Sequence, residues 1–370
     1  MTTYLLAGGG TAGHVNPLLA TADALRERHP DAEIIVLGTA EGLEARLVPQ
    51  RGYELVTIPK LPFPRRPTPG ALAFPARLRR VVRRVRGLIA SRGVSVVAGF
   101  GGYASAPAYL AAHRQRVPFV IHEANARPGL ANRLGARRAA RVATALPGTP
   151  LPRAEVVGMP LRPEISRLAL ARSRGDDRAL VATGRRALGL DDRPVLLVTG
   201  GSLGARHINR VLVEAAQAIV DAGWQVVHIA GTRGDVVDPG VSGYHLLAYC
   251  DDMQDALAVA GLAISRSGAS TVSELSALAV PAVYVPYPHG NGEQELNARP
   301  AVVAGAARLV ADARLDAAWI DAELQPLLAD PATRARMRRA ARGIGIVDAA
   351  DRLAAMVDDA AAGRGRGDEE

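Results

Sequence analysis

A glycine-rich turn between a short apolar run and a helical segment constrains the fold of this chain more than any other feature. It lies in the stretch YLLAGGGTAGHVNPLLATADAL, which runs from Tyr4 to Leu25. Residues 4–7 are typical of a buried strand, and residues 18–25 are typical of a helix with Pro17 near its first turn. Glycines let the backbone turn sharply, and the N-terminus of the following helix carries partial positive charge. The stretch therefore predicts an α/β fold with an anion-binding turn after its first strand.

Three interpretations of this turn compete. Gly8, Gly10 and Gly13 match the G-x-G-x-x-G spacing of dinucleotide sites. Such sites also need an acidic residue that closes the second strand, but that strand ends in Gly38-Thr39 and Glu41 comes late. No Gly-Lys-Ser/Thr follows, so a P-loop is excluded. The turn could also do no more than pack a helix on a strand. We favour a phosphate-binding turn with His14 at its rim.

The same unit of strand, glycine turn and helix occurs twice more. VVAGFGGYASAP covers residues 96–107, and LLVTGGSLGARHIN covers residues 196–209. Open α/β sheets bind their ligands at the carboxyl ends of the strands. Two such turns in the first half and one that opens the second half indicate two phosphate-bearing substrates.

Strand-like and helical runs alternate along the whole chain, which predicts parallel sheets with crossover helices. A chain of 370 residues exceeds the usual size of one core, so we expect two domains. We place them at 1–162 and 194–345, with a linker and a helix at 163–193. Residues 346–370 are predicted as a helix and a polar tail, the helix packing back on the N-terminal domain. The expected strands are 4–7, 34–37, 95–98, 118–121, 154–157, 194–199, 225–230, 262–265, 281–285 and 308–310.

The cysteine content and the hydropathy of the sequence indicate the cellular compartment in which the protein is expected. Cys250 is the single cysteine, so no disulfide can form within the chain, as is typical of a reducing compartment. The sequence shows neither a signal peptide nor an uncharged apolar stretch near the roughly 18 residues that a membrane span needs. These features predict a soluble, cytoplasmic protein.

The net charge of +9 is unevenly distributed. Between Leu55 and His122 there is no Asp or Glu, while Lys60 and eleven arginines fall in that stretch. Such a region favours an anionic partner, which could be nucleic acid, a phosphorylated substrate or an anionic membrane. Apolar residues from Phe74 to Ile89 recur at helical spacing, which is also typical of a helix packed on a core. We predict that residues 60–76, with Phe63, contact lipid headgroups.

The second half contains the stretch ISRSGASTVSELSALAVPAVYVPYPHGNGEQELNA, residues 264–298. A strand is expected to end at Ser265 and a helix to begin near Val272, which would put Glu274 in the first helical turn. A carboxylate there suits the vicinal hydroxyls of a ribose, and it would equally support the helix dipole. The loop after Pro286 is rich in amides and carboxylates, as a reader of sugar hydroxyls or a solvated loop would be.

Ordered motifs make the chain similar to a known family. From about Leu5 to Ala298 they are GGGTAGHVNP, GFGGYASAP, HEANARPGLAN, GMPLR, GGSLGAR, DDM, SRSGASTVSE and EQELNA. They resemble the peptidoglycan N-acetylglucosaminyltransferases, which convert lipid I to lipid II. The resemblance implies two Rossmann-like, doubly wound parallel-sheet domains facing across a cleft, the GT-B fold. It also implies an inverting enzyme with neither metal nor cofactor, and no Asp-x-Asp metal motif occurs in the sequence.

The resemblance implies a substrate pair and a cellular location. The donor is UDP-N-acetylglucosamine, and the acceptor is the 4-hydroxyl of N-acetylmuramoyl-(pentapeptide)-pyrophosphoryl-undecaprenol. The enzyme would be peripheral, at the cytoplasmic face of the cell membrane, on anionic inner-leaflet lipids. Other cell-wall or division proteins are implied as partners. Nucleic acid is not expected as a partner, because the aromatic residues that stack on bases are scarce.

The resemblance also implies roles for individual residues. His14 matches the catalytic base, Ser202 faces the donor diphosphate and Glu274 holds the ribose. Asn125 and Arg162 lie near the donor, Cys250 lies beside the uracil and Gln294 contacts a sugar. The implied substrate-binding residues are Thr11, Ala12, Gly13, Asn125, Arg162, Ser202, Cys250, Ala269, Ser270, Thr271, Val272, Ser273, Glu274 and Gln294. In the alternative interpretation His14 only binds phosphate or caps the turn, and Glu123 or His122 is the base.

Four residues depart from the family pattern. Ala12 replaces a glycine, Ala124 and Leu203 each replace a glutamine, and Glu293 stands where histidine or glutamine is frequent. These departures affect the details of donor contacts rather than the proposed catalytic group. Two rival classes remain: another GT-B glycosyltransferase acting on a glycolipid or a natural product, and a non-catalytic basic membrane-binding protein.

Overall fold

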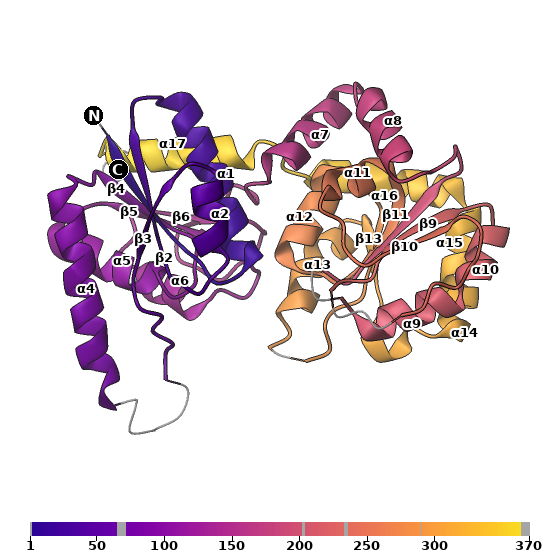
Figure 1. Cartoon of the computed structure of the whole chain (residues 1–370), viewed down its shortest axis with the longest axis horizontal. Helices are drawn as coiled ribbons and strands as arrows, with labels where there is room; N and C mark the ends of the chain where they lie inside the picture. Colours follow the sequence, from indigo (N-terminus) through magenta and orange to yellow (C-terminus); the bar gives the residue numbers. More distant parts are fainter. Residues whose placement is uncertain (1, 65–71, 202–203, 233–235, 290, 364–370) are drawn as a thin grey trace. The chain divides into compact units, whose positions relative to one another are not determined.

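The computed structural model describes residues 2–64, 72–201, 204–232, 236–289 and 291–363. The chain forms two compact units, each built on one parallel sheet (Figure 1). Unit 1 is Met1–Arg162 with Asp348–Glu370, and unit 2 is Pro163–Val347. The predicted α/β class with two parallel-sheet domains is confirmed, and the cleft between them stays a prediction.

Unit 1 contains a seven-stranded sheet in the order β3-β2-β1-β4-β5-β6-β7. Its strands are β1 (Thr3–Ala7), β2 (Glu33–Gly38), β3 (Glu54–Thr57), β4 (Val96–Gly99), β5 (Phe119–Glu123), β6 (Arg141–Thr144) and β7 (Ala154–Val156). The central strands are short apolar runs because helices cover both faces of the sheet. The strand order reverses between β1 and β4, and this is where open α/β sheets bind ligands.

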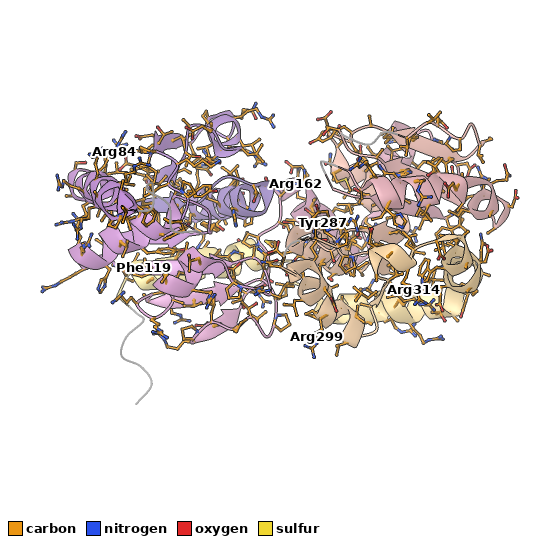
Figure 2. All side chains as sticks on the ribbon, turned by 90° about the horizontal axis from the view of Figure 1, so that it is seen from below. Arg84, Phe119, Arg162, Tyr287, Arg299 and Arg314 are labelled. Carbon is orange, nitrogen blue, oxygen red and sulfur yellow. The ribbon has the colours of Figure 1, made fainter. Side chains whose placement is uncertain are left out.

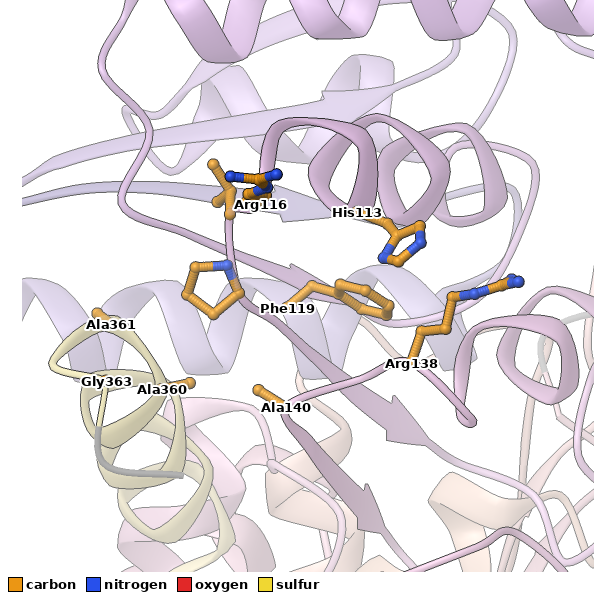
Figure 3. Close-up of a pocket in the computed structure, with 10 residues that line it drawn as sticks. His113, Arg116, Phe119, Arg138, Ala140, Ala360, Ala361 and Gly363 are labelled. Atoms are coloured by element: carbon orange, nitrogen blue, oxygen red, sulfur yellow. The ribbon is translucent and has the colours of Figure 1, made fainter. Parts of the chain in front are cut away.

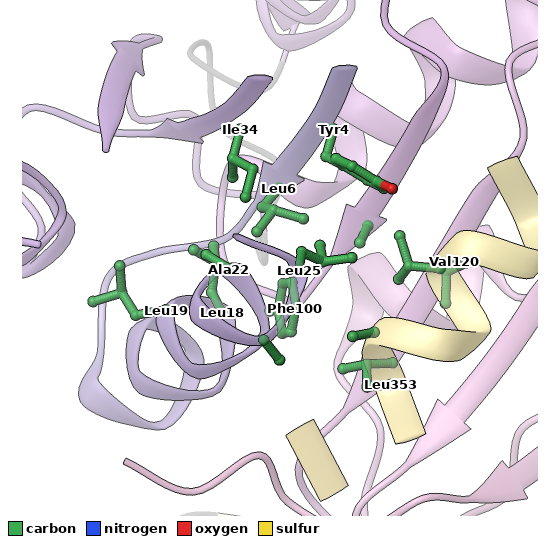
Figure 4. Close-up of a cluster of buried hydrophobic side chains, with 14 of the residues drawn as sticks. Tyr4, Leu6, Leu18, Leu19, Ala22, Leu25, Ile34, Phe100, Val120 and Leu353 are labelled. Carbon is green, nitrogen blue, oxygen red and sulfur yellow. The ribbon is translucent and has the colours of Figure 1, made fainter. Parts of the chain in front are cut away.

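The helices of unit 1 bury both faces of this sheet. They are α1 (Ala12–Arg28), α2 (Glu44–Gln50), α4 (Phe74–Ser91), α5 (Ser105–Gln115), α6 (Leu130–Gly135) and α17 (Ala349–Ala361). One core cluster joins α1 and α17 to the sheet, with Leu18 and Leu353 fully buried (Figure 4). A second cluster lies under α4 and α5, and Val82 and Val85 of α4 are buried in it. The helix α17 therefore packs on unit 1 although the whole of unit 2 precedes it in the sequence.

Unit 2 repeats this topology with six parallel strands in the order β10-β9-β8-β11-β12-β13. The strands are β8 (Val195–Thr199), β9 (Gln225–Ile229), β10 (Tyr244–Leu247), β11 (Ala260–Ser265), β12 (Ala282–Tyr284) and β13 (Ala307–Leu309). The helices include α7 (Pro163–Arg174), α8 (Arg178–Ala187), α9 (Arg206–Glu214), α10 (Ala216–Asp221), α11 (Met253–Val259), α12 (Ala269–Ala277), α13 (Glu293–Val303), α14 (Ala317–Trp319), α15 (Gln325–Ala329) and α16 (Pro331–Ile344). The order reverses between β8 and β11, as it does between β1 and β4.

Several element boundaries differ from the sequence-based expectation. The strands β3, β6 and β10 were not predicted, and residues 163–193 form two helices, α7 and α8, instead of one. The helix α1 begins at Ala12, so Pro17 lies inside it. The helix α12 begins at Ala269, directly after an extended Gly268, so Glu274 lies beyond the first turn.

The basic stretch is divided between core and surface. On α4 the side chains of Val81, Val82, Val85 and Ile89 are buried, so this part of the helix packs on the core. The α4 arginines are exposed, and Figure 2 shows Arg84 among them. Phe63 and Phe74 are half-buried with their ring centroids 5.3 Å apart, while Leu72 is 85% exposed. Residues 65–71 of the predicted lipid-contacting segment lie outside the described residues. None of the described helices is both long and apolar enough to cross a membrane.

Candidate active site

The carboxyl edge of the unit 1 sheet brings together three loops that the sequence singled out. The loop after β1 leads to His14, the loop after β4 contains Gly101 and Gly102, and the loop after β5 contains Asn125. Because β1, β4 and β5 are neighbouring parallel strands, these loops lie at one edge of the sheet. The first two flank the point where the strand order reverses.

His14 lies in the first turn of α1 and is half-buried. Its Nδ1 atom is 3.1 Å from the carbonyl oxygen of Gly9 and 3.3 Å from Oγ1 of Thr11. A carbonyl oxygen only accepts hydrogen bonds, so Nδ1 carries the proton when it bonds to Gly9. In the neutral ring Nε2 is then the nitrogen with the lone pair, and this is the atom that could take a proton from a substrate.

The second glycine turn packs closely against the first. Gly101 has φ +93°, and a Cβ atom there would lie 3.0 Å from Nε2 of His14. A Cβ atom on Gly102, which has φ +79°, would overlap the carbonyl of Gly9. Only glycine combines this backbone conformation with such a close approach. Ser105, fully buried, accepts a hydrogen bond from the N–H of Gly101 at 2.9 Å and ties the turn to α5.

The two alternative bases are engaged within the protein. His122 is 2% exposed, its Nε2 lies 2.9 Å from the carbonyl of Gly158, and burial lowers its pKa to about 4. Glu123 is 3% exposed and accepts hydrogen bonds from the N–H groups of Asn125 and Gly129 at 3.0 and 2.9 Å. It also accepts one from Nδ2 of Asn132 at 2.9 Å. Glu123 therefore shapes the loop that presents Asn125.

Sequence reasoning missed Glu44, which lies under the first glycine turn. Its side chain is fully buried, and its carboxylate accepts hydrogen bonds from Gly10 at 2.8 Å and from the N–H of Thr39 at 2.9 Å. A dinucleotide site would use a carboxylate after β2 to bind a ribose, but this one is engaged by the protein's own loops. The available signal was an acidic residue at the start of an amphipathic segment six residues after β2.

The carboxyl edge of the unit 2 sheet contains the second group of predicted residues. The turn after β8 begins at Gly200, and Ser267-Gly268 after β11 leads directly into α12. On α12 the side chains of Ala269 and Val272 are buried, so these two can offer a ligand only their backbone. The side chains of Ser270, Thr271, Ser273 and Glu274 are half-buried. Ser202 and Leu203 lie outside the described residues.

The loop after β12 is tied to the turn after β11 by amide side chains. Oε1 of Gln294 accepts hydrogen bonds from the N–H groups of Ser267 at 3.2 Å and Tyr287 at 3.0 Å. Nδ2 of the fully buried Asn297 donates to the carbonyl of Ser267 at 3.3 Å. The amide oxygen of Gln294 thus has a structural role, which leaves its Nε2 group for contact with a ligand.

The remaining predicted residues lie near these edges of their own units. Cys250 is half-buried in the segment after β10. Arg162 is half-buried in the segment after β7 and is labelled in Figure 2. Within the described part of the chain, no group of three or more His, Cys, Asp or Glu residues is placed to hold a metal ion.

A cavity of about 500 Å³ lies at the opposite edge of the unit 1 sheet. It is lined by residues that precede β5 and β6 and by the end of α17, with His113, Arg116 and Arg138 among its walls (Figure 3). Because substrates of open α/β sheets bind at the carboxyl edge, we do not assign this cavity to them.

Two Rossmann-like units, each with glycine turns where its strand order reverses, are the architecture of the GT-B fold, which is a common fold of glycosyltransferases. The model of the glycosyltransferase family 28 N-terminal domain matches residues 4–144, and that of the family 28 C-terminal domain matches residues 195–353. The chain belongs to glycosyltransferase family 28.

The chain is also similar to individual proteins, two by sequence and one by structure. The chain is 58% identical to the UDP-N-acetylglucosamine–N-acetylmuramyl-(pentapeptide) pyrophosphoryl-undecaprenol N-acetylglucosamine transferase of Leifsonia xyli subsp. xyli, over 96% of this chain and 98% of the relative. It is 59% identical to the transferase of that name from Clavibacter michiganensis subsp. michiganensis, over 98% of both chains. The crystal structure of MurG from Acinetobacter baumannii superposes with a TM-score of 0.77 at 26% identity, covering 97% of this chain and 100% of that one.

Proposed function

We propose that this chain transfers N-acetylglucosamine from UDP-N-acetylglucosamine to the 4-hydroxyl of the N-acetylmuramoyl sugar of lipid I, forming lipid II for peptidoglycan synthesis. The observation that carries the proposal is the pair of His14 and the glycine turn at the carboxyl edge of unit 1. Relatives that are 58–59% identical over nearly their whole length bear the name of this transferase.

In the proposed mechanism, Nε2 of His14 removes the proton from the acceptor hydroxyl. The hydroxyl oxygen attacks the anomeric carbon of the donor sugar as the bond to the diphosphate breaks, and the bond electrons leave with UDP. Attack opposite the leaving group inverts the anomeric centre, which passes through a state of oxocarbenium character. Backbone N–H groups of the turn after β1 and the start of α1 offer a site for the acceptor's pyrophosphate.

We assign the donor to unit 2. The helix N-terminus after Gly200 and the guanidinium of Arg162 would stabilise the charge that grows on the leaving diphosphate. Glu274 would accept hydrogen bonds from the ribose hydroxyls, with Nε2 of Gln294 on the sugar and Cys250 beside the uracil. The half-buried side chains of Ser270, Thr271 and Ser273 support a polar nucleotide contact on the same helix.

The acceptor carries a long lipid, so we propose that unit 1 binds peripherally to the cytoplasmic face of the membrane. Exposed Leu72 and the exposed arginines of α4 support this surface. An apolar side chain beside several cations is the combination that binds anionic lipid headgroups. Other cell-wall or division proteins remain proposed partners.

The test is a transfer assay with labelled UDP-N-acetylglucosamine and two acceptors, a lipid I analogue and a hydrophobic aglycone. We expect a labelled disaccharide on the lipid I analogue and at least about tenfold less product on the aglycone, a discrimination of about 1.4 kcal/mol. Equal or preferential use of the aglycone would instead assign the chain to a natural-product glycosyltransferase.

A further inference from the structure

One peptide group connects the buried carboxylate of Glu44 to the ring of His14. Oε2 of Glu44 accepts a hydrogen bond from the N–H of Gly10 at 2.8 Å. The carbonyl of the same peptide group, that of Gly9, lies 3.1 Å from Nδ1 of His14. The N–H and C=O of a trans peptide point in opposite directions, so this peptide bridges the carboxylate and the imidazole.

The second oxygen of Glu44 is held just as firmly. Oε1 accepts hydrogen bonds from the N–H of Thr39 at 2.9 Å and from its hydroxyl at 2.7 Å. Burial acts to raise the pKa of Glu44, but the hydrogen bonds from Gly10 and Thr39 outweigh it and hold this pKa below its usual range. The carboxylate is therefore ionised at neutral pH, and a charged acceptor makes stronger hydrogen bonds than a neutral one.

The surrounding backbone leaves space for this carboxylate and for no further side chain. A Cβ atom on Gly9 or Gly42 would overlap the carboxyl group of Glu44, and a Cβ atom on Gly38 would overlap its Cγ atom. Gly9 lies in the loop after β1, Gly38 ends β2 and Gly42 lies in the loop after β2, so two separate segments enclose one charged group. Burying a charge costs several kcal/mol unless it is fully hydrogen-bonded, and both oxygens of this carboxylate are hydrogen-bonded. Because one of these hydrogen bonds comes from the peptide that contacts His14, the buried charge points to a role in the reaction.

We propose that Glu44 is a positioning residue for the transfer reaction. It holds the Gly9–Gly10 peptide in the orientation in which the Gly9 carbonyl accepts the Nδ1 proton of His14, and so keeps Nε2 as the basic nitrogen. Hydrogen bonds in a chain polarise one another, so the charge of Glu44 also makes the Gly9 carbonyl a better acceptor. The inference rests on the proposed function, because it assigns to Glu44 the control of the base in that reaction.

The kinetic test uses Glu44→Gln, which keeps the shape of the side chain but turns one acceptor oxygen into a donor. We expect kcat to fall about tenfold or more, part of the range that a general base contributes, while KM for the donor stays within about twofold. Glu44→Asp, which keeps the charge, should recover part of the loss. Asp23→Asn is the matched control, because Asp23 also accepts hydrogen bonds within unit 1, from Arg51 and Tyr53 at 2.7 Å each. The control should lose thermal stability and keep its kcat within about twofold.

The spectroscopic test needs no substrate. Protein labelled with ¹⁵N-histidine is studied at about pH 8.5, where an ordinary imidazole is neutral, and His14 is assigned by its missing signals in His14→Gln. Two-bond ¹⁵N–¹H correlations should show Nδ1 protonated and Nε2 unprotonated in the wild type, and a mixture of both tautomers in Glu44→Gln. If Glu44→Gln keeps the wild-type tautomer and the wild-type kcat, the proposal is overturned and Glu44 only anchors the loop. A tautomer that changes in a protein without transferase activity would support the link to Glu44 and refute the proposed function.

Discussion

At the scale of single residues, we propose that His14 takes part in proton transfer and that Glu274 binds the donor. Glu274 is the sixth residue of α12, and helix-dipole stabilisation falls off within the first turn. The alternative of a residue that only supports the dipole therefore loses its physical basis. The carboxylate is half-buried on this helix, and its proposed role in ribose binding is tested by substitution.

We predict that Glu274→Ala weakens UDP binding by about 1.5–3 kcal/mol, because a charge-assisted pair of hydrogen bonds to the ribose is lost. Calorimetric titration with UDP measures the effect. Glu295→Ala is the matched control, since Glu295 is exposed on the neighbouring α13. A dissociation constant that Glu274→Ala leaves unchanged would make Glu274 a structural residue of α12.

The sequence singled out the candidate residues that lie close, along the chain, to a recognisable motif. His14 and Glu274 each follow a glycine turn that comes after a strand, so the sequence placed both near the carboxyl ends of strands. Glu44 could not be identified in this way, because its hydrogen-bond partner Gly10 lies 34 positions away in the sequence. The same holds for the engagement of Glu123 by Asn132, which depends on how α6 packs against β5.

At the scale of elements, the sequence located ten of the thirteen described strands and missed β3, β6 and β10. The apolar runs of β1, β2 and β8 are continuous, as parallel strands between two layers of helices require. The edge strands β3 and β10 have the short sequences ELVT and YHLL, which show no regular alternation, and both strands are mostly half-buried. The strand β6 has the sequence RVAT, whose single large apolar residue gives no periodicity to detect.

The start of α4 is the element that tests membrane binding. We predict that replacing Leu72 by Ser together with Arg77→Glu and Arg80→Glu abolishes sedimentation with anionic vesicles. Each arginine near the surface adds about 1 kcal/mol of attraction, and charge reversal turns that into repulsion. Activity on a short-chain, water-soluble acceptor should stay within about twofold of wild type, because the three side chains are exposed and not part of the core.

The control for this experiment reverses the same number of charges elsewhere. Arg314→Glu with Arg339→Glu changes two exposed arginines of unit 2 and should leave vesicle binding intact. If the α4 variant sediments as well as wild type, the membrane-binding surface is not at the start of α4, and these arginines are only solvated surface.

At the scale of the whole molecule, each unit contains one buried histidine that resists protonation. Burial lowers the pKa of His122 in unit 1 and of His228 in unit 2 from 6.5 to about 4. The unfolded chain takes up a proton near pH 6.5, whereas the folded chain does so only near pH 4. The contribution to stability is therefore complete above pH 6.5 and is lost as the pH falls toward 4.

We predict that the buried histidine of each unit lowers the free energy of unfolding of that unit by about 2 kcal/mol when the pH is lowered from 7 to 5. Urea unfolding at the two pH values measures the loss. In His228→Gln, which cannot titrate, the loss for unit 2 should shrink by that amount, while the loss for unit 1 stays the same. An unchanged pH dependence of unit 2 would show that His228 is not buried in its neutral form.

The central claim is that this chain transfers N-acetylglucosamine with His14 as its base, and single-turnover transfer to a soluble lipid I analogue tests it most directly. We predict that the wild type forms a product with an inverted anomeric centre, seen by NMR. His14→Ala should form this product at least about a hundredfold more slowly, which is the usual cost of losing a general base. The affinity of His14→Ala for UDP should equal that of the wild type, because we assign the donor to unit 2. Product formed by His14→Ala at nearly the wild-type rate, or with the donor's own anomeric configuration, would contradict the account.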